Sequence, residues 1–278
     1  MPEQLSESVR EQYRYELLTW PEINEAAAMR KVVVLPVGAT EQHGPHLPLD
    51  TDFKLASAVA NEAGRRTPED MLVMPAVPYG YTHHVQDFPG TIDIQIQHLL
   101  DFVVDVTKSV AHHGFRRILL ADGHGSNMPI LDLVARRTIL ETEALCAPFL
   151  WPSLALKEIR QLRESGRGGM SHACELETSV YLYLDAGRVQ MDKARKEMDQ
   201  PASEFIWSDL TDPGPIRMMD YWTRFSKSGV NGDPTLATAE KGRVIFESVV
   251  RNFVRLAREF KNRPDGERVD YHRTNWPA

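Results

Sequence analysis

The sequence predicts an α/β fold in which helices cover a mostly parallel sheet. Short apolar runs, typical of buried strands, alternate with longer amphipathic runs, typical of helices, from residue 32 onward. Polar residues of the kinds that bind metals gather directly after three of the predicted strands. Open α/β sheets place their ligands beyond the carboxyl ends of the strands, so we expect these three loops to meet in one crevice.

The predicted elements follow one another along the chain with short connections. We expect strands at 32–37, at 71–80 running into a loop, at 116–125 including the loop after it, and at 145–152. We expect helices at 53–66, at 96–114 ending on Gly114, at 128–142, at 153–164 and at 174–187 ending on Gly187. The result is a series of βα units.

The last third of the chain is less regular. Residues 188–230 show no clear periodicity, and we interpret them as an irregular insertion near the site. Asp233 and Pro234 have the character of an N-cap and a first helical residue, so we expect a long final helix to begin there. We expect one domain over 1–262 and a polar C-terminal tail over 263–278.

Composition excludes several classes of protein. The 278 residues carry a formal net charge of −7, which favours neither nucleic acid nor an anionic membrane as a partner. The two cysteines, Cys146 and Cys174, form no CxxC pair, which fits a reducing cytoplasm. The N-terminus lacks the apolar core of a signal peptide, and no apolar run is long enough to predict a transmembrane helix.

The stretch TEQHGPHLPLDTD, residues 40–52, is the richest in chemistry. Glu41 and His43 lie two residues apart, so in an extended segment both side chains face the same way. Asp52 adds a second carboxylate, and carboxylates and imidazole are ligands of Zn²⁺ and Mn²⁺. The alternative is that Asp52 and its neighbours simply cap the helix that follows.

Two further segments carry histidines at turns. In ADGHGSN, residues 121–127, His124 lies between glycines at a strand end, although such a turn can equally present a surface histidine. In SHACELETS, His172 precedes a helix and Glu177 lies one turn into it, as a proton shuttle and a ligand would. The alternative is that Ser171 caps this helix while Glu175 and Glu177 complement its dipole.

Two other readings stay open at this point. Cys174 and His172 could form a nucleophilic pair, but a separation of two residues rarely gives the geometry that such a pair needs. The loop YGYTHHVQDFPG, which includes Tyr79 and His83, fits either a substrate wall or a surface turn.

Taken in order, PVGATEQHGPHLPLDTD, DGHGSN, SHACELETS and NGDPTLATAEKG resemble the creatininase (creatinine amidohydrolase) superfamily, and the likeness covers nearly the whole chain. The resemblance implies a three-layer α/β/α sandwich, a ring-like homo-oligomer such as a hexamer, and two divalent ions per subunit, Zn²⁺ or Mn²⁺ with Fe²⁺ as a further choice. By position, one ion is assigned to Glu41, Asp52 and His124, and the other to His43, Asp52 and Glu177. His172 matches the catalytic histidine.

The resemblance also suggests supporting residues. They are expected to orient ligands or to contact substrate: Asp122, Ser126, Asn127, Ser171, Tyr79 and His83. Departures from creatininase at Gly125, Ser126, Gly168, Ser171 and Cys174 remove the residues that grip creatinine. We therefore expect a family member other than creatininase itself.

These observations predict a hydrolase that opens a small cyclic amide or lactone by attack of a metal-bridging hydroxide. One alternative is a deformylase or peptidase that acts on an acyclic amide. A second alternative is a metal-binding scaffold without catalysis, against which the histidine at 172 argues. A small molecule is the expected substrate.

Overall fold

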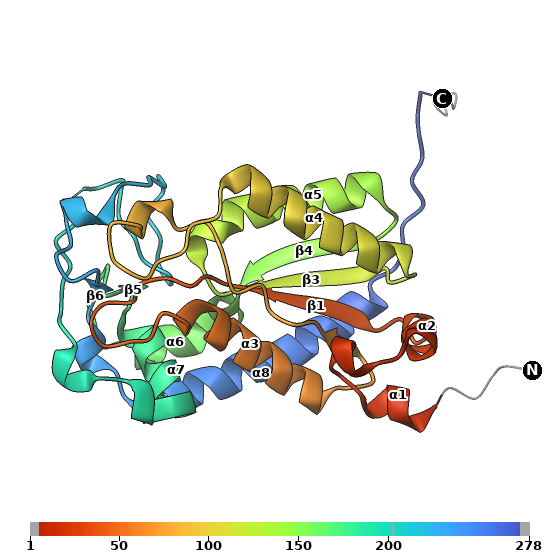
Figure 1. Ribbon diagram of the computed structural model, residues 1–278, viewed down its shortest axis with the longest axis horizontal. Helices are drawn as coiled ribbons and strands as arrows, with labels where there is room; N and C mark the ends of the chain where they lie inside the picture. Colours follow the sequence, from red (N-terminus) through yellow and green to blue (C-terminus); the bar gives the residue numbers. More distant parts are fainter. Residues whose placement is uncertain (1–5, 202, 273–278) are drawn as a thin grey trace, which may run out of the picture.

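A central four-stranded sheet organises the computed structural model, which describes residues 6–201 and 203–272. Its strands are β1 (Val32–Val37), β2 (Met71–Val73), β3 (Arg117–Asp122) and β4 (Leu145–Leu150). They pair in the order β2-β1-β3-β4, and every pair is parallel. The parallel sheet is the one the sequence predicts (Figure 1).

Helices cover both faces of the sheet and make three layers. Helices α4 (Ile96–His112) and α5 (Met128–Glu141) lie on one face (Figure 1). The other face carries α3 (Thr51–Arg66), α8 (Ala239–Asn262), α6 (Leu156–Leu162) and α7 (Glu175–Asp185). Alternate residues of β1 enter the two cores, Val32 and Val34 one of them and Val33 the other. A strand buried on both sides explains the unbroken apolar run VVVLPV.

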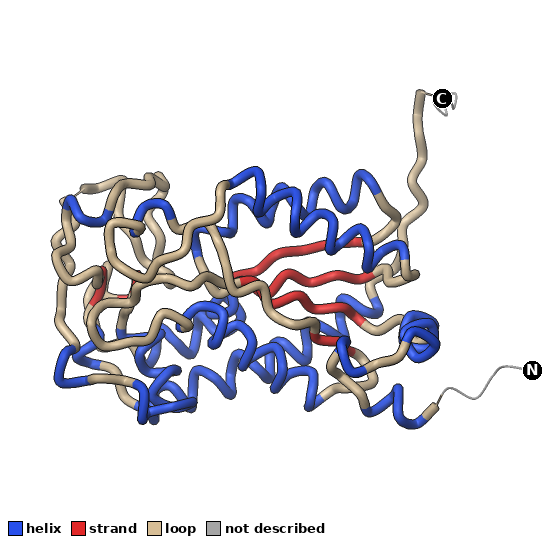
Figure 2. The backbone as a smooth tube through the Cα atoms, viewed as in Figure 1, coloured by secondary structure: helices blue, strands red, loops and turns tan. Residues whose placement is uncertain are grey.

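The strand order reverses between β1 and β3, because the chain places β2 on one side of β1 and then β3 and β4 on the other. Ligands in open α/β sheets bind at such a reversal. The loops after β1 and β3 lie at this end of the sheet, which Figure 2 shows as the loop-rich end of the molecule. Gly123, in the loop after β3, lets this loop pack closely against the first turn of α3, since a Cβ at this position would lie 2.2 Å from the backbone oxygen of Asp52.

The strand predicted to run into a loop within 71–80 ends at Val73, because Pro75 and Pro78 cannot donate to a ladder. One predicted boundary is wrong. The final helix begins at Ala239, not at Pro234. The Asp233 carboxylate accepts the backbone N–H of Thr235 and starts a 3₁₀ turn, Pro234–Leu236. The side-chain hydroxyl of Thr238 accepts the backbone N–H of Lys241 and so caps the N-terminus of α8.

Other elements were not predicted. The glycine-rich stretch before α7 holds β5 (Met170–His172), which pairs antiparallel with β6 (Asn231–Gly232). Near the N-terminus lie α1 (Glu7–Glu11) and α2 (Trp20–Ala28), and α2 starts with a capping box. A 3₁₀ turn, Trp151–Ala155, replaces the first part of the helix expected over 153–164.

The irregular segments have these structures. Within the described part of 188–230, the regular structure consists of the 3₁₀ turns Met191–Lys193 and Trp222–Arg224 and the end of the turn Ala186–Arg188. After α8 the chain leads away from the body without helix or strand as far as residue 270, and 273–278 of the expected tail lie outside the described residues (Figure 1). No helix of the described residues has the length and apolarity needed to cross a bilayer.

Candidate metal centre

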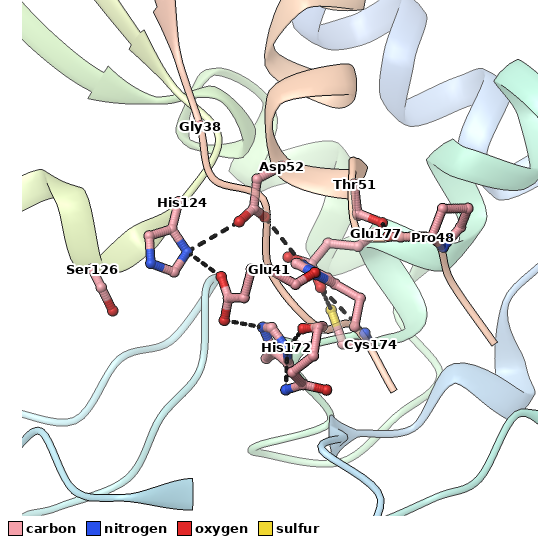
Figure 3. A network of polar contacts seen from close by, with 12 residues as sticks. Gly38, Glu41, Pro48, Thr51, Asp52, His124, Ser126, His172, Cys174 and Glu177 are labelled. Atoms are coloured by element: carbon pink, nitrogen blue, oxygen red, sulfur yellow. Dashed lines mark hydrogen bonds and ion pairs between the residues drawn. The ribbon is translucent and has the colours of Figure 1, made fainter. Parts of the chain in front are cut away.

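Six side chains from five separate segments meet at the carboxyl end of the sheet, and Figure 3 labels all of them except His43. The loop after β1 contributes Glu41 and His43, and the first turn of α3 contributes Asp52. The remaining three are His124 after β3, His172 at the end of β5 and Glu177 in the first turn of α7. All six are buried, so the structure brings together every residue that the sequence proposed as a metal ligand or catalytic group.

Asp52 lies between two histidines. Its Oδ1 lies 3.1 Å from Nε2 of His43, and its Oδ2 lies 3.1 Å from Nδ1 of His124. The same His124 nitrogen lies 2.7 Å from Oε2 of Glu41. Each oxygen of the Asp52 carboxylate therefore faces a different half of the cluster.

Three overlapping groups of side chains have ligand atoms within 4.8 Å of one another, close enough to share a metal ion. The groups are Glu41, His43 and His172; Glu41, His84 and His124; and His43, Asp52 and Glu177. The third group is one of the two ligand sets that the family resemblance implies. The second adds His84, which the sequence analysis did not select.

Backbone carbonyls set the orientation of two of the rings. Nδ1 of His43 lies 3.1 Å from the carbonyl oxygen of Glu41, and Nε2 of His124 lies 2.9 Å from that of Tyr81. A carbonyl accepts hydrogen bonds, so these nitrogens carry the protons. The other nitrogen of each ring faces the cluster, where it would offer its lone pair once a metal ion replaces the proton, as metal-binding histidines do.

Several buried atoms of the cluster have no hydrogen-bond partner. They are both carboxylate oxygens of Glu41, Nε2 of His43 and Oδ2 of Asp52. Leaving a charged oxygen buried without a partner is costly, and native proteins avoid it unless an ion or water satisfies the group. Carboxylates and imidazole lone pairs that converge in this way are a donor set that fits a divalent cation.

The charges of the cluster shift one another. Burial raises the pKa of Glu41 to about 7 and raises that of Glu177 as well. Burial would lower the pKa of His43, but the Asp52 carboxylate outweighs it and raises the value to about 10. Burial would raise the pKa of Asp52, but His43 and then His124 hold it well below its usual range. Without a metal ion, protonated histidines thus surround the Asp52 carboxylate. The same negative carboxylate would stabilise a bound cation in their place.

His172 has a different environment. Its Nε2 lies 2.8 Å from the backbone carbonyl oxygen of Gln42 and 3.1 Å from the side-chain nitrogen of the same residue, while Nδ1 faces Glu41, with Oε1 3.7 Å away. Its ring centroid lies 4.2 Å from that of His43. Burial, and then the charge of His43, lower the pKa of His172 well below its ordinary value. The ring is therefore neutral, and its Nδ1 lies on the side of the cluster.

Asp122 and Asn127 support the cluster from behind. Oδ1 of Asp122 accepts the backbone N–H of His124 at 3.1 Å and lies 3.3 Å from Nδ2 of Asn127. Oδ1 of Asn127 accepts the backbone N–H of Tyr81, whose carbonyl fixes the ring of His124. Burial raises the pKa of Asp122 to about 8. Both residues hold the His124 turn in place.

The four other candidates lie farther out. Oγ of Ser126 is 3.4 Å from Nε2 of His84, and Oγ of Ser171 accepts from Asn231. Tyr79 is 47% exposed, and His83 pairs with Asp93 at 3.0 Å instead of the cluster. His84 is the histidine of this loop that faces inward, and the sequence analysis chose its neighbour.

Of the two glutamates at the start of α7, Glu177 faces the cluster. Glu175 instead accepts the backbone N–H groups of Glu164 and Ser165 and the ammonium of Lys241 at 2.6 Å. Oε2 of Glu177 accepts from the backbone N–H and the thiol of Cys174, at 3.3 and 3.4 Å. Burial raises the pKa of the Cys174 thiol, which removes the thiolate that a nucleophilic cysteine needs.

The helix-capping alternatives hold for Glu177, whose carboxylate accepts the backbone N–H of the N-cap residue Cys174 in a capping box, but not for Asp52 or Ser171. Asp50 occupies the N-cap of α3 but makes no side-chain hydrogen bond to that helix, and it accepts the hydroxyl of Tyr181 at 2.8 Å. Cys174, not Ser171, is the N-cap of α7. Asp52 therefore lies in the cluster, not in a cap.

Comparisons with known proteins agree with this geometry. A family model described as creatininase, creatinine amidohydrolase, matches residues 16–257. The mycofactocin precursor peptide peptidase of Mycobacterium tuberculosis is 34% identical over 84% of this chain and 87% of its own length. Creatinine amidohydrolase of Pseudomonas putida is 30% identical over 87% of this chain and 95% of its own length.

Solved structures of creatininase have the same fold. A manganese form superposes with a TM-score of 0.76 at 27% identity, over 89% of this chain and 98% of that one. A mutant of the Zn-Zn type gives a TM-score of 0.75 at the same identity and coverage. The family match, the shared fold and the buried cluster lead to one conclusion: this chain belongs to the creatininase family.

Proposed function

We propose that this protein is a divalent-metal-dependent amidase with a two-metal centre that hydrolyses an acyclic amide, in particular a peptide bond. The position of Asp52 carries the proposal, since one of its oxygens faces His43 and the other faces His124. Glu41, Asp52 and His124 would hold one ion. His43, Asp52 and Glu177 would hold the other, with Asp52 shared between them.

The donor set also bears on the metal. Mixed oxygen and nitrogen ligands suit Zn²⁺, Mn²⁺ and Fe²⁺, and creatininase has been solved in Zn-Zn and Mn forms. When bound, such ions lower the pKa of water and polarise a carbonyl group. His84 lies within reach of Glu41 and His124, so it is an additional ligand candidate for the first ion.

His172 would move the proton of the reaction. With its Nε2–H held by the Gln42 carbonyl, the neutral ring would keep Nδ1 free on the side of the cluster. A neutral imidazole in this position can take a proton from water and deliver it to the leaving nitrogen. The competing assignment is that Nδ1 is itself a metal ligand, because His172 also groups with Glu41 and His43.

The choice of an acyclic amide rests on the relatives. The mycofactocin precursor peptidase is more similar in sequence than the Pseudomonas creatinine amidohydrolase, at 34% against 30% identity. The chain also carries glycine and serine at Gly125 and Ser126, where creatininase has larger gripping residues. Opening of a cyclic amide or lactone is the second candidate, supported by the likeness to creatinine amidohydrolase over 95% of its length. A ring-like homo-oligomer remains part of the proposal.

A product screen tests the proposal. The protein is loaded with Zn²⁺ or Mn²⁺ and incubated with synthetic peptides, formylated amines, lactams and lactones, and the products are identified by mass spectrometry. We expect new amino termini from peptides, and none after the metal is removed. Turnover restricted to lactams or lactones would select the second candidate. Equal turnover by metal-free protein would contradict both.

A further inference from the structure

The turn Trp222–Arg224 places an aromatic wall over the metal centre. The ring of Trp222 lies 4.4 Å from that of His172 at an interplanar angle of 87°, and 5.5 Å from that of His84 at 70°. Trp222 thus contacts both a proposed catalytic group and a ligand candidate, although it comes from the irregular segment of the chain. Its side chain is partly exposed, so it forms a surface of the site and is not fully enclosed in a core.

Glu197 fastens the segment just after this tryptophan. Its carboxylate accepts the hydroxyl of Ser226 at 2.8 Å and the backbone N–H groups of Lys227 and Ser228 at 2.7 and 2.9 Å. On the other side, the hydroxyl of Thr223 donates to Asp87 at 2.7 Å. A carboxylate with several donors holds a loop in a defined geometry, so the indole has a fixed position over the site.

The C-terminal end of the same segment is linked to His172 through Gln42. The backbone carbonyl of Gly229 accepts a hydrogen bond from the side-chain amide of Gln42 at 2.9 Å, and the backbone carbonyl of Gln42 faces His172. Gly229 has φ +82, and a Cβ there would lie 2.0 Å from Oε1 of Gln42. Glycine is required both for the left-handed backbone and for this close approach. The 222–229 segment is therefore built into the active site at both of its ends.

We propose that Trp222 is a specificity-determining residue that binds an apolar side chain of the substrate beside the scissile amide. The proposal rests on the proposed amidase function and names a substrate class for it. An indole next to buried side chains gives an apolar side chain favourable contacts, whereas a charged side chain there would lose water without gaining a partner. One large apolar side chain buried in this way is worth about tenfold or more in kcat/KM.

The test is a cleavage profile on peptides that differ in one residue, from glycine through leucine and phenylalanine to lysine, on each side of the cut bond. We expect wild-type protein to prefer the large apolar residues over glycine by about tenfold. In Trp222→Ala this preference should fall to within about twofold, and Trp222→Phe should retain most of the preference. Trp207→Ala is the matched control, because the Trp207 indole in the same segment donates to the Asp212 carbonyl and stacks under Arg167.

A binding measurement keeps this inference separate from the amidase proposal. The affinities of N-acetyl-phenylalaninamide and N-acetyl-glycinamide are measured by ligand-observed NMR for wild type, Trp222→Ala and Trp207→Ala. The expected result is tighter binding of the phenylalanine compound, lost in Trp222→Ala alone. If no peptide is cut but this difference holds, the amidase proposal fails and the role of Trp222 stands. If Trp222→Ala lowers the cleavage of all peptides equally, or leaves both the cleavage preference and the binding preference for apolar side chains unchanged, Trp222 is not a specificity residue.

Discussion

Nδ1 of His124 lies 2.7 Å from Oε2 of Glu41, and both side chains are buried. The other nitrogen of the ring faces the Tyr81 carbonyl, which directs the lone pair of Nδ1 toward the carboxylate. Two lone pairs at this separation would repel each other, so a positive charge has to lie beside them. Without metal that charge is a proton on His124: burial lowers the pKa of His124, but the carboxylates of Glu41 and Asp52 raise it well above its ordinary value. A bound cation satisfies both atoms, and this relationship is the physical basis of the predictions below.

Removing metal should destabilise the protein, because the native state then keeps buried carboxylates without partners. A single ion present at a hundred times its Kd stabilises the folded state by about 2.7 kcal/mol. For a chain of this size that corresponds to a fall in Tm of roughly 5 °C after chelation. The measurement is a thermal melt before and after chelator treatment, with Zn²⁺ or Mn²⁺ added back. An unchanged Tm would show that no ion of this affinity is bound.

Replacing Asp52 should cost both ions, since each of its oxygens faces a different half of the cluster. We expect Asp52→Asn to hold close to no metal, and His43→Ala and His124→Ala to keep roughly one ion each, because each removes a ligand from one proposed set. Elemental analysis of the purified variants gives the metal content per chain. Asp52→Asn with the wild-type content would disprove the shared role.

The two glutamates of α7 offer a matched pair of variants. Glu177→Gln should lower the metal content, because Glu177 groups with His43 and Asp52. Glu175→Gln should leave the metal content unchanged and instead lower stability by about 3 kcal/mol, because it breaks a buried pair with Lys241. Metal analysis and chemical denaturation are run on both. The opposite pattern would mean that Glu175 is the ligand.

Replacing His172 separates its two possible roles. As the proton carrier, His172→Ala should keep the wild-type metal content and lose about 10²- to 10⁴-fold in kcat. His172→Gln, which restores a polar group without a titratable proton, should not recover the rate. A parallel loss of metal from both variants would instead identify His172 as a ligand. Trp207→Ala again serves as the control for general damage.

The parts of the fold that the periodicity of apolar residues determines could be predicted from the sequence. Each main strand and the helices after them follow from apolar runs, whereas short elements such as Met170–His172 form because a distant partner, Asn231–Gly232, pairs with them. The predicted start of α8 was wrong because the segment contains two N-cap residues. Asp233 caps a 3₁₀ turn, and Thr238 caps the helix itself. Local signals do not say which of two consecutive caps begins the longer element.

The candidate site was predictable where one segment carries several ligands at fixed spacing. Glu41, His43 and Asp52 lie close together in the sequence, in the loop after β1 and the first turn of α3, and their pairing with the other segments came from the family resemblance. His84 lies beside Glu41 and His124, and the sequence does not say which of the two adjacent histidines in the 3₁₀ turn His83–Val85 turns inward. Trp222 lies in a long irregular segment, so no periodic sequence pattern predicts its contact with His172.

The most direct test of the two-metal centre is anomalous X-ray diffraction from crystals of the protein grown with Zn²⁺ or Mn²⁺. We predict two anomalous peaks per chain on either side of the Asp52 carboxylate, one next to Glu41 and His124 and the other next to His43 and Glu177. A single peak, a peak elsewhere in the fold, or no peak with saturating metal would contradict the account.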